Sequence, residues 1–440
     1  MANPLAESAV QAIELDAWAK DVPSYIPFDK TLYGGFRNNA TIVPVSNVTS
    51  AGGVTRPSFR VPMRLQAGAP ITQGTGNGDS LGRGSGSQYG AFAVSPVFFY
   101  NVCEITYLAR IATEGRKRGL FNVQAQELKN TYQQATQGLE SLIQGDGTGT
   151  LDSIPSTATV NNGTGAGQAL SSIVGLNNAF QFQDQQTVQV FTSGGVLRGA
   201  FPISYTDPVS QTIYSAQALP AGTTTTDLLV VAGASGAAGG SILGLQAWQL
   251  NSNTGTIGGL SRASYPGRLS TPTIDLAGKS VSTTTPYRMR VLMSRALGQD
   301  QAALKSGQFY CGQDQAMQIS SLYLQMQVVN AARPNTGGAT SPDLTPHDWS
   351  EQWGGFPVRV GMNATPGRID LFTYSTWYMG ETVPLELYDF GGGITMAPVP
   401  DITNGGYLTS VMFAYNACFN IVNSLVKAGC YITNAGGPTL

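Results

Sequence analysis

Ser80 is the side chain whose sequence surroundings come closest to those of a catalytic nucleophile. The run from Gly78 to Gly82 (GDSLG) matches the G-x-S-x-G pattern, in which a sharp strand-to-helix turn exposes a serine hydroxyl. Here the run lies inside residues 68–90, which are rich in Gly, Ser and Thr, and no helical pattern follows it. Because a segment of this composition cannot hold the strained turn that the pattern requires, we expect no catalytic role for Ser80.

The single histidine, His347, does not complete a catalytic site either. The GDSLG block resembles the opening block of the GDSL-type esterases, which also need Asp-x-x-His late in the chain. In this sequence Asp343 stands four residues before His347, one position too far. One histidine also excludes a two-histidine metal site within one chain. We therefore interpret His347 as an ordinary residue of a proline-containing loop.

Two glycine-containing patterns suggest nucleotide binding, but both are incomplete. The run from Ala277 to Ser280 (AGKS) ends like a phosphate-binding P-loop, yet Thr273 stands where that loop needs its first glycine. The GxGxG run that begins at Gly74 lacks both a strand before it and a helix after it. Neither pattern predicts a bound nucleotide.

The cysteines do not suggest a site. They are Cys103, Cys311, Cys418 and Cys430. The sequence has no C-x-x-C pair to bind zinc or carry out redox chemistry, so we expect reduced, mostly buried thiols in a cytosolic product. The sequence therefore predicts no catalytic, cofactor-binding or metal-binding residues, and no cofactor.

The composition is typical of a protein that is covered by neighbours. Charged residues make up 11% of the 440 residues, against about 25% in soluble domains, and Gly, Ser, Thr, Asn and Gln replace them. Isolated proteins use scattered charge for solubility, so such a surface favours a subunit of an assembly or a secreted β-rich protein. The net charge of −2 and the short basic run Arg116–Arg118 do not predict sequence-specific nucleic-acid binding. We expect no secretion signal, because residues 1–10 contain Glu7 and no apolar run.

The first part of the chain predicts an arm, a hairpin and a long helix. Prolines interrupt residues 1–56, although Ala6–Lys20 could form a short amphipathic helix. Alternating residues at Phe59–Leu65 predict a strand, and Ala91–Val102 predicts the returning strand, with Gly68–Gly90 as an unusually long link. The helix is predicted over Leu120–Gln144, with one apolar stripe. That stripe consists of Leu128, Tyr132, Ala135, Leu139 and Leu142.

Residues 150–260 predict short strands in a small antiparallel barrel or sandwich. These strands are Thr187–Phe191, Gly199–Ile203, Thr212–Ala216 and Asp227–Val231. A second helix is predicted over Pro286–Leu297, and the mixed pattern of Asp314–Asn330 predicts helix first and strand second. Later strands are predicted at Gln308–Cys311, Val358–Met362, Ile369–Tyr374 and Val411–Val422. The period of two in Val411–Val422 predicts a long, half-buried strand, and the asparagines at 416, 420 and 423 argue against a membrane span there.

This order of elements resembles the major capsid proteins of tailed bacteriophages, whose fold bacterial encapsulins share. Two local runs add to the resemblance, Gly258–Arg262 (GGLSR) and Gly354–Val360 (GGFPVRV), together with the apolar ending Ser424–Ile432. The resemblance implies an α+β, Hong-Kong-type phage capsid fold. It divides the chain into an N-terminal arm (1–56), an extended-loop hairpin (57–107), a spine helix with peripheral domain (108–150), an inserted β-rich domain (151–260), an axial domain (261–400) and a closing peripheral-sheet strand with the C-terminus (401–440).

The implied function is structural and not enzymatic. The resemblance implies self-assembly into the hexamers and pentamers of an icosahedral head shell, made in the host bacterial cytoplasm and enclosing double-stranded DNA without reading its sequence. It also implies a separate scaffolding protein, a portal and a decoration protein as partners, and no membrane. Some family members join subunits by a Lys–Asn bond from the extended loop, but residues 57–107 contain no lysine, so we expect a non-covalent shell. A secreted or surface β-rich adhesin, or a GDSL-type esterase, is the alternative.

Overall fold

The computed structural model describes residues 31–49, 55–66, 68, 86–107, 123–163, 170–237, 239–282, 284–297, 307–319, 356–400 and 406–436. The chain divides into two compact units, each built from separate stretches of sequence. Unit 1 comprises Met1–Tyr33, Val97–Ile242 and Glu381–Phe419, and unit 2 comprises Gly34–Pro96, Leu243–Gly380 and Asn420–Leu440. Both contain helices and sheets, as expected for an α+β protein.

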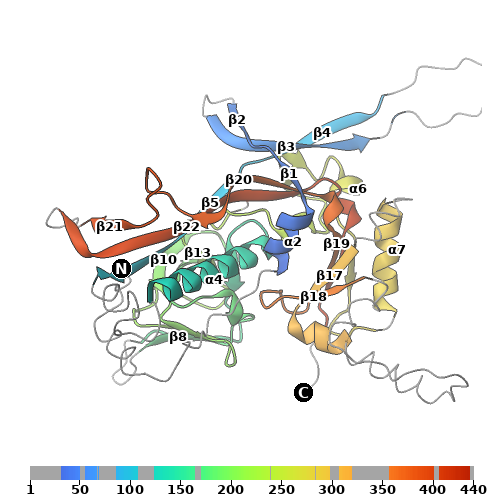
Figure 1. Ribbon diagram of the computed structural model, residues 1–440. Coiled ribbons are helices and arrows are strands. Elements are labelled where there is room, and N and C mark those ends of the chain that lie inside the picture. Colours follow the sequence, from blue (N-terminus) through green and yellow to red (C-terminus); the bar gives the residue numbers. More distant parts are fainter. Residues whose placement is uncertain are drawn as a thin grey trace, which may run out of the picture. The chain divides into compact units, whose positions relative to one another are not determined.

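Helix α4 (Val123–Gln144) is the longest helix of unit 1 in the described part of the chain. It confirms the predicted helix over these residues, while residues 120–122 lie outside the described ones. Leu139 and Leu142 of the predicted stripe are buried, together with Ile143. Tyr132 is partly exposed and packs edge-on against Tyr415, with ring centroids 5.6 Å apart. The helix lies against strand β5 (Val97–Thr106) (Figure 1).

Two four-stranded antiparallel sheets follow α4 in unit 1. The first has the order β10 (Leu197–Pro202), β9 (Thr187–Phe191), β13 (Leu228–Val231), β6 (Thr150–Ser153). The second has the order β11 (Tyr205–Asp207), β12 (Thr212–Ser215), β8 (Ser171–Val174), β7 (Thr159–Asn161). A 3₁₀ turn, η2, spans Ala179–Gln181. All four predicted strands are confirmed, with ends that differ by at most two residues. Alternate side chains fill the interior, among them Ile173, Val188, Val190, Ile213 and Leu229.

Strand β22 (Tyr407–Asn423) is the longest strand among the described residues, and β20 (Trp377–Leu387) pairs with it. In unit 1, β22 also pairs with β5 and with β21 (Ala397–Pro400). The sequence predicted a half-buried strand at Val411–Val422, which is wrong for the end of this range, since every residue from Phe419 to Asn423 is buried. Asn420 shows why: its amide nitrogen donates to the Ser95 carbonyl at 2.9 Å, and its amide oxygen accepts from the Leu243 backbone at 3.0 Å.

A three-stranded ribbon in unit 2 contains β2 (Ser46–Thr49), β3 (Thr55–Gln66) and β4 (Gln88–Val94). Strands β3 and β4 form the predicted antiparallel hairpin, in a register that pairs Phe59 with Val94. The predicted return at Ala91–Val102 is wrong as a single strand, because it is broken between β4 and β5 at Pro96, which has no amide hydrogen for a ladder. The last three residues of the predicted Gly68–Gly90 link belong to β4.

Helix α2 (Thr31–Asn39) lies within the predicted arm and was not predicted from the sequence. Gly34 and Gly35 are poor helix formers, so the local pattern is weak. In unit 2, the Phe36 ring packs against the rings of Phe372 and Trp377, with centroids 5.9 and 5.0 Å away. Strand β1 (Thr41–Val43) then pairs in parallel with the unit 2 part of β20. The helix predicted at Ala6–Lys20 lies outside the described residues.

The second sheet of unit 2 has five strands. Their order is β16 (Thr273–Asp275), β23 (Cys430–Thr433), β19 (Ile369–Thr373), β17 (Gly307–Cys311), β18 (Val358–Val360). Helix α7 (Thr285–Leu297) lies beside this sheet and buries Met289 and Met293 in its core (Figure 1). The predicted second helix and the three predicted strands are therefore confirmed. A helix over 313–319 agrees with the first half of the prediction for Asp314–Asn330, and the rest of that range lies outside the described residues.

Short elements complete unit 2. They are α5 (Leu245–Trp248), β14 (Thr256–Ile257), β15 (Leu260–Ser261), α6 (Pro266–Leu269), η3 (Tyr374–Thr376) and η4 (Val426–Ala428).

Candidate functional site

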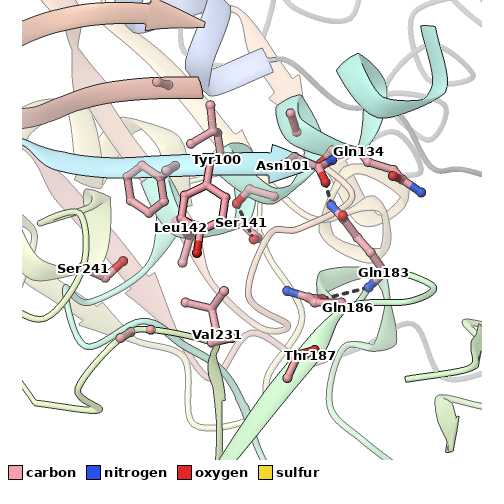
Figure 2. Close-up of a pocket in the computed structure, with 18 of the residues that line it drawn as sticks. Tyr100, Asn101, Gln134, Ser141, Leu142, Gln183, Gln186, Thr187, Val231 and Ser241 are labelled. Atoms are coloured by element: carbon pink, nitrogen blue, oxygen red, sulfur yellow. Dashed lines mark hydrogen bonds between the residues drawn. The ribbon is translucent and has the colours of Figure 1, made fainter. Parts of the chain in front are cut away.

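A cavity of about 590 Å³ opens in unit 1 between β5, α4 and the β-rich region. Figure 2 shows Tyr100, Leu142 and Val231 around the hollow, with an amide-rich wall on one side. That wall is held by its own hydrogen bonds: the Gln183 side chain donates to the Gln134 carbonyl at 2.8 Å, and the Gln183 backbone donates to the Gln186 side chain at 3.0 Å. The cavity is thus a preformed, mostly uncharged hollow.

The cavity walls lack the groups that acid–base catalysis needs. Asp184 is the carboxylate among the lining residues, and it already accepts from the Thr206 backbone at 2.9 Å. The Ser141 hydroxyl donates to the Gly138 carbonyl at 2.8 Å, and the lining residues include no histidine or lysine that could act as its base. This arrangement can accept an uncharged or aromatic group, but it offers no nucleophile with a base beside it.

Strand β5 forms one wall of the cavity and carries a row of exposed apolar side chains. Phe98, Tyr100 and Val102 alternate along it and are 49%, 71% and 51% exposed. In the described part of the chain β5 pairs with β22 alone, so its other edge has no strand partner among the described residues. An edge strand with large exposed apolar groups is a surface suited to contact with another chain.

The β3–β4 hairpin of unit 2 has one anchored face. Phe59, Val61 and Phe92 are buried on it. The Phe92 ring packs edge-on against Trp248, with centroids 4.9 Å apart, and the Ala93 amide donates to the Gly258 carbonyl at 2.9 Å. These contacts fix the base of the hairpin to the body of unit 2.

The opposite face of the hairpin is exposed and basic. Arg60 and Arg64 lie on it, and their cross-strand neighbours are Ala93 and Tyr89. Tyr89 is 71% exposed. Within the described residues neither arginine has an ion pair, so this face presents two free cations and an aromatic ring to a partner.

Arg262 belongs to the GGLSR run, whose first residue, Gly258, bonds to the hairpin through the Ala93 amide. Its guanidinium is buried and donates to the carbonyls of Leu250 (3.3 Å), Ala247 (2.8 Å) and Leu269. Desolvation lowers the pKa of this side chain. Gly258 has a φ of +53°, and a Cβ there would lie 2.8 Å from the Phe92 ring, so only glycine suits the position. The run thus acts as a structural support.

The sequence motifs considered above lie only partly within the described residues. Ser80, Asp343 and His347 lie outside the described residues. Lys279 ends a turn that begins at Leu276 and Ser280 follows it; both side chains are exposed, and no helix comes directly after them. Within the described ranges, no group of three or more His, Cys, Asp or Glu side chains is arranged to hold a metal ion.

The cysteines are free thiols, as predicted. Cys311 and Cys430 are buried, and desolvation raises the pKa of each to about 12. Cys103 and Cys418 are partly exposed, and desolvation raises both pKa values, that of Cys103 to about 11.

Two buried carboxylates, those of Glu140 and Asp370, were not identified from the sequence. The Glu140 carboxylate accepts from the backbone amides of Leu32 (2.5 Å) and Tyr33 (2.9 Å), and so caps the first turn of α2. In unit 2, Asp370 is buried and accepts two bonds from Arg368, at 2.9 and 3.0 Å. No local pattern marks either residue, because their partners are distant in sequence or set by the sheet.

No helix in the described stretches of the chain is long and apolar enough to cross a membrane.

Comparison with known proteins gives matches in three-dimensional structure alone. No protein-family model matches the sequence, and no curated protein matches it. A chain of the Cyanophage A-1(L) capsid asymmetric unit matches with a TM-score of 0.53 and 11% identity, over 94% of this chain and 95% of that one. The capsid of a native GTA particle (TM-score 0.44, 10% identity, 98% and 100% covered) and the capsid of Myoviridae Phage XM1 (0.42, 8%, 94% and 95%) are also similar. Over nearly its whole length, this chain has the fold of the protein in the cyanophage capsid.

Proposed function

We propose that this chain is a major capsid protein, which assembles with copies of itself into the hexamers and pentamers of an icosahedral phage head around double-stranded DNA. The likeness to the cyanophage capsid chain over 94% of the sequence carries this proposal. The role proposed is structural and not catalytic, and the product is part of the virion, assembled in the host bacterial cytoplasm.

The proposed roles of the segments follow the capsid fold. Residues 1–56 are the arm, 57–107 the extended loop, 108–150 the spine helix with peripheral domain, and 151–260 an inserted β-rich domain. Residues 261–400 form the axial domain, and 401–440 the closing strand and C-terminus. The low charge of the chain and the exposed apolar row on β5 support broad contact between subunits. A scaffolding protein, a portal and a decoration protein are the further partners that we propose.

The hairpin is the element proposed to reach a neighbouring subunit. Its base is anchored in unit 2 through Phe92 and the Ala93 amide, while its outer face and the edge strand β5 carry exposed groups. Interfaces that hold obligate assemblies bury upwards of about 2,000 Å² each, more than isolated surface side chains provide. Extended segments that cross onto a neighbour supply such area.

Shortening the hairpin tests this role. Residues 67–87 are replaced by Asn-Gly, which leaves the paired strands from Gln66 and Gln88 intact. We expect the circular dichroism spectrum of the subunit to persist and the yield of particles to collapse. The matched control replaces residues 67–87 with a Gly-Ser linker of the same length, which keeps the reach of the hairpin and removes its sequence. Shells as numerous and robust as the parent's from the shortened chain would contradict the proposal.

The same variant separates the proposal from esterase activity, because it also removes Ser80. An esterase would lose ester turnover and keep its oligomeric state, whereas a shell protein loses its particles. The shell proposed is non-covalent, since the extended loop has no lysine. Boiling in detergent should therefore dissolve particles to one band near 46.2 kDa, and a ladder of cross-linked species would refute this part.

A further inference from the structure

The nearly neutral chain conceals two oppositely charged units. Unit 1 holds 8 Lys and Arg against 18 Asp and Glu, a net charge of −10, whereas unit 2 holds 16 against 8, a net charge of +8. The overall value of −2 hides this separation. With only 11% charged residues, so uneven a division between the units is the main electrostatic feature of the molecule.

The same asymmetry appears at the surface. Among the described residues of unit 2, ten Lys and Arg are exposed against two Asp and Glu. In the described part of unit 1, the exposed charged residues are one base, Lys129, and four acids. Those acids are Asp146, Asp184, Glu386 and Asp389. The charges that a second molecule meets on each unit therefore have the sign of that unit's net charge.

The hairpin concentrates the positive charge on a sheet face without a partner. Arg60 and Arg64 are four residues apart in β3, so their side chains lie on the same, exposed face. Strands β2, β3 and β4 contain no acidic residue. The buried face of the hairpin is occupied by the contacts of Phe92, so the arginine face is the one available to another molecule.

We infer that the head-to-tail contacts within the proposed rings are steered by charge, with the basic unit 2 of one copy, led by Arg60 and Arg64, contacting the acidic unit 1 of the next. This inference rests on the proposed self-assembly and adds its direction and driving force. Like units repel each other, so a two-fold interface between identical patches is disfavoured. Opposite patches on one chain give a heterologous contact, which closes into rings when the rotation permits. Complementary charge also speeds encounter and suppresses wrong pairings.

The test reverses the charge of each unit separately. One variant carries Arg60→Glu and Arg64→Glu, and the other carries Asp184→Lys and Glu386→Lys. Each alone should cut the rate of assembly, followed by light scattering, roughly tenfold or more at low salt. Mixed together they should recover six-membered rings, in which the two variants alternate so that each hairpin contacts a surface of opposite charge; a five-membered ring cannot alternate, so closed shells are not expected from the mixture. Arg60→Lys with Arg64→Lys is the charge-keeping control, and circular dichroism checks that every variant is folded.

Salt provides an independent measurement on the parent chain. Raising NaCl from 0.05 to 0.5 M should slow assembly roughly tenfold or more, because salt screens exposed charges, and should have a smaller effect on either reversed variant alone. Assembly that is unaffected by the hairpin reversal, or reversed variants that fail both alone and mixed, would overturn the head-to-tail inference. Normal shells that no longer retain DNA would overturn it as well and assign the arginine face to nucleic acid. Absence of any assembly by the parent at every salt concentration would instead overturn the proposed function.

Discussion

Phe92→Ala should release the base of the hairpin from unit 2. The Phe92 ring is fully buried, lies opposite Val61 in the hairpin and packs edge-on against Trp248. Truncating a buried phenylalanine to alanine costs about 3–5 kcal/mol, through lost burial and the cavity that remains. The Gly258 backbone closes over the ring and cannot follow the smaller side chain without breaking its own bond to Ala93. We therefore expect most of this cost to appear as local opening.

Hydrogen exchange at the Ala93 amide measures that opening directly. This amide donates to the Gly258 carbonyl at 2.9 Å, so its protection reports whether the hairpin is docked. At 1.4 kcal/mol for each factor of ten, a cost of about 3–5 kcal/mol lowers the protection about 100-fold to 4,000-fold. Tyr89→Ala is the matched control, because it truncates an aromatic side chain on the same strand that is 71% exposed. A fall of less than about threefold in Phe92→Ala would refute the argument that this contact anchors the hairpin.

Three further predictions concern the buried polar groups and the thiols. Glu140→Gln should lower the free energy of unfolding by about 1–3 kcal/mol in urea titrations, because the charged acceptor of the Leu32 and Tyr33 amides is lost, whereas Glu386→Gln on the surface should leave it unchanged. Burial raises the pKa of Glu127 above its ordinary value of 4.5, so the folded state binds the carboxyl proton more tightly than the unfolded state does. The stability that this group contributes therefore falls as the pH rises from 4.5 through the raised pKa. Glu127→Gln should therefore gain stability relative to the parent as pH rises from 4.5, and a constant difference would contradict the assignment. At pH 8 a thiol reagent should leave Cys311 and Cys430 unmodified in the folded subunit and label all four cysteines after unfolding, because burial raises the pKa of those two thiols to about 12.

Segments with a clear period could be predicted from the sequence. The stripe that includes Leu139 and Leu142 predicted α4, and the alternation from Phe59 to Leu65 predicted β3. In both cases the side chains that repeat are the ones the structure buries. The period of a segment reflects the environment on each of its faces, so it is visible before the partners are known.

The elements that depend on distant partners could not be predicted in this way. Helix α2 contains two glycines, and its first turn is capped by Glu140, more than 100 residues away. The asparagines of β22 suggested a solvated face, but Asn420 is paired with Ser95 and Leu243. Polar residues can be buried when each finds a partner, and sequence spacing does not reveal that partner. The charge separation was hidden for the same reason, since each unit is assembled from three separate stretches of chain.

Imaging of the purified chain tests the central claim most directly. The chain is expressed with its scaffolding protein, fractionated by sedimentation and examined by negative-stain and cryo-electron microscopy. Capsid function predicts closed icosahedral shells built of hexamers and pentamers, or free capsomers that close into shells when mixed with scaffold. A folded monomer whose mass by sedimentation is near 46.2 kDa at high concentration, with no shells or capsomers in any condition, would contradict the proposed capsid function.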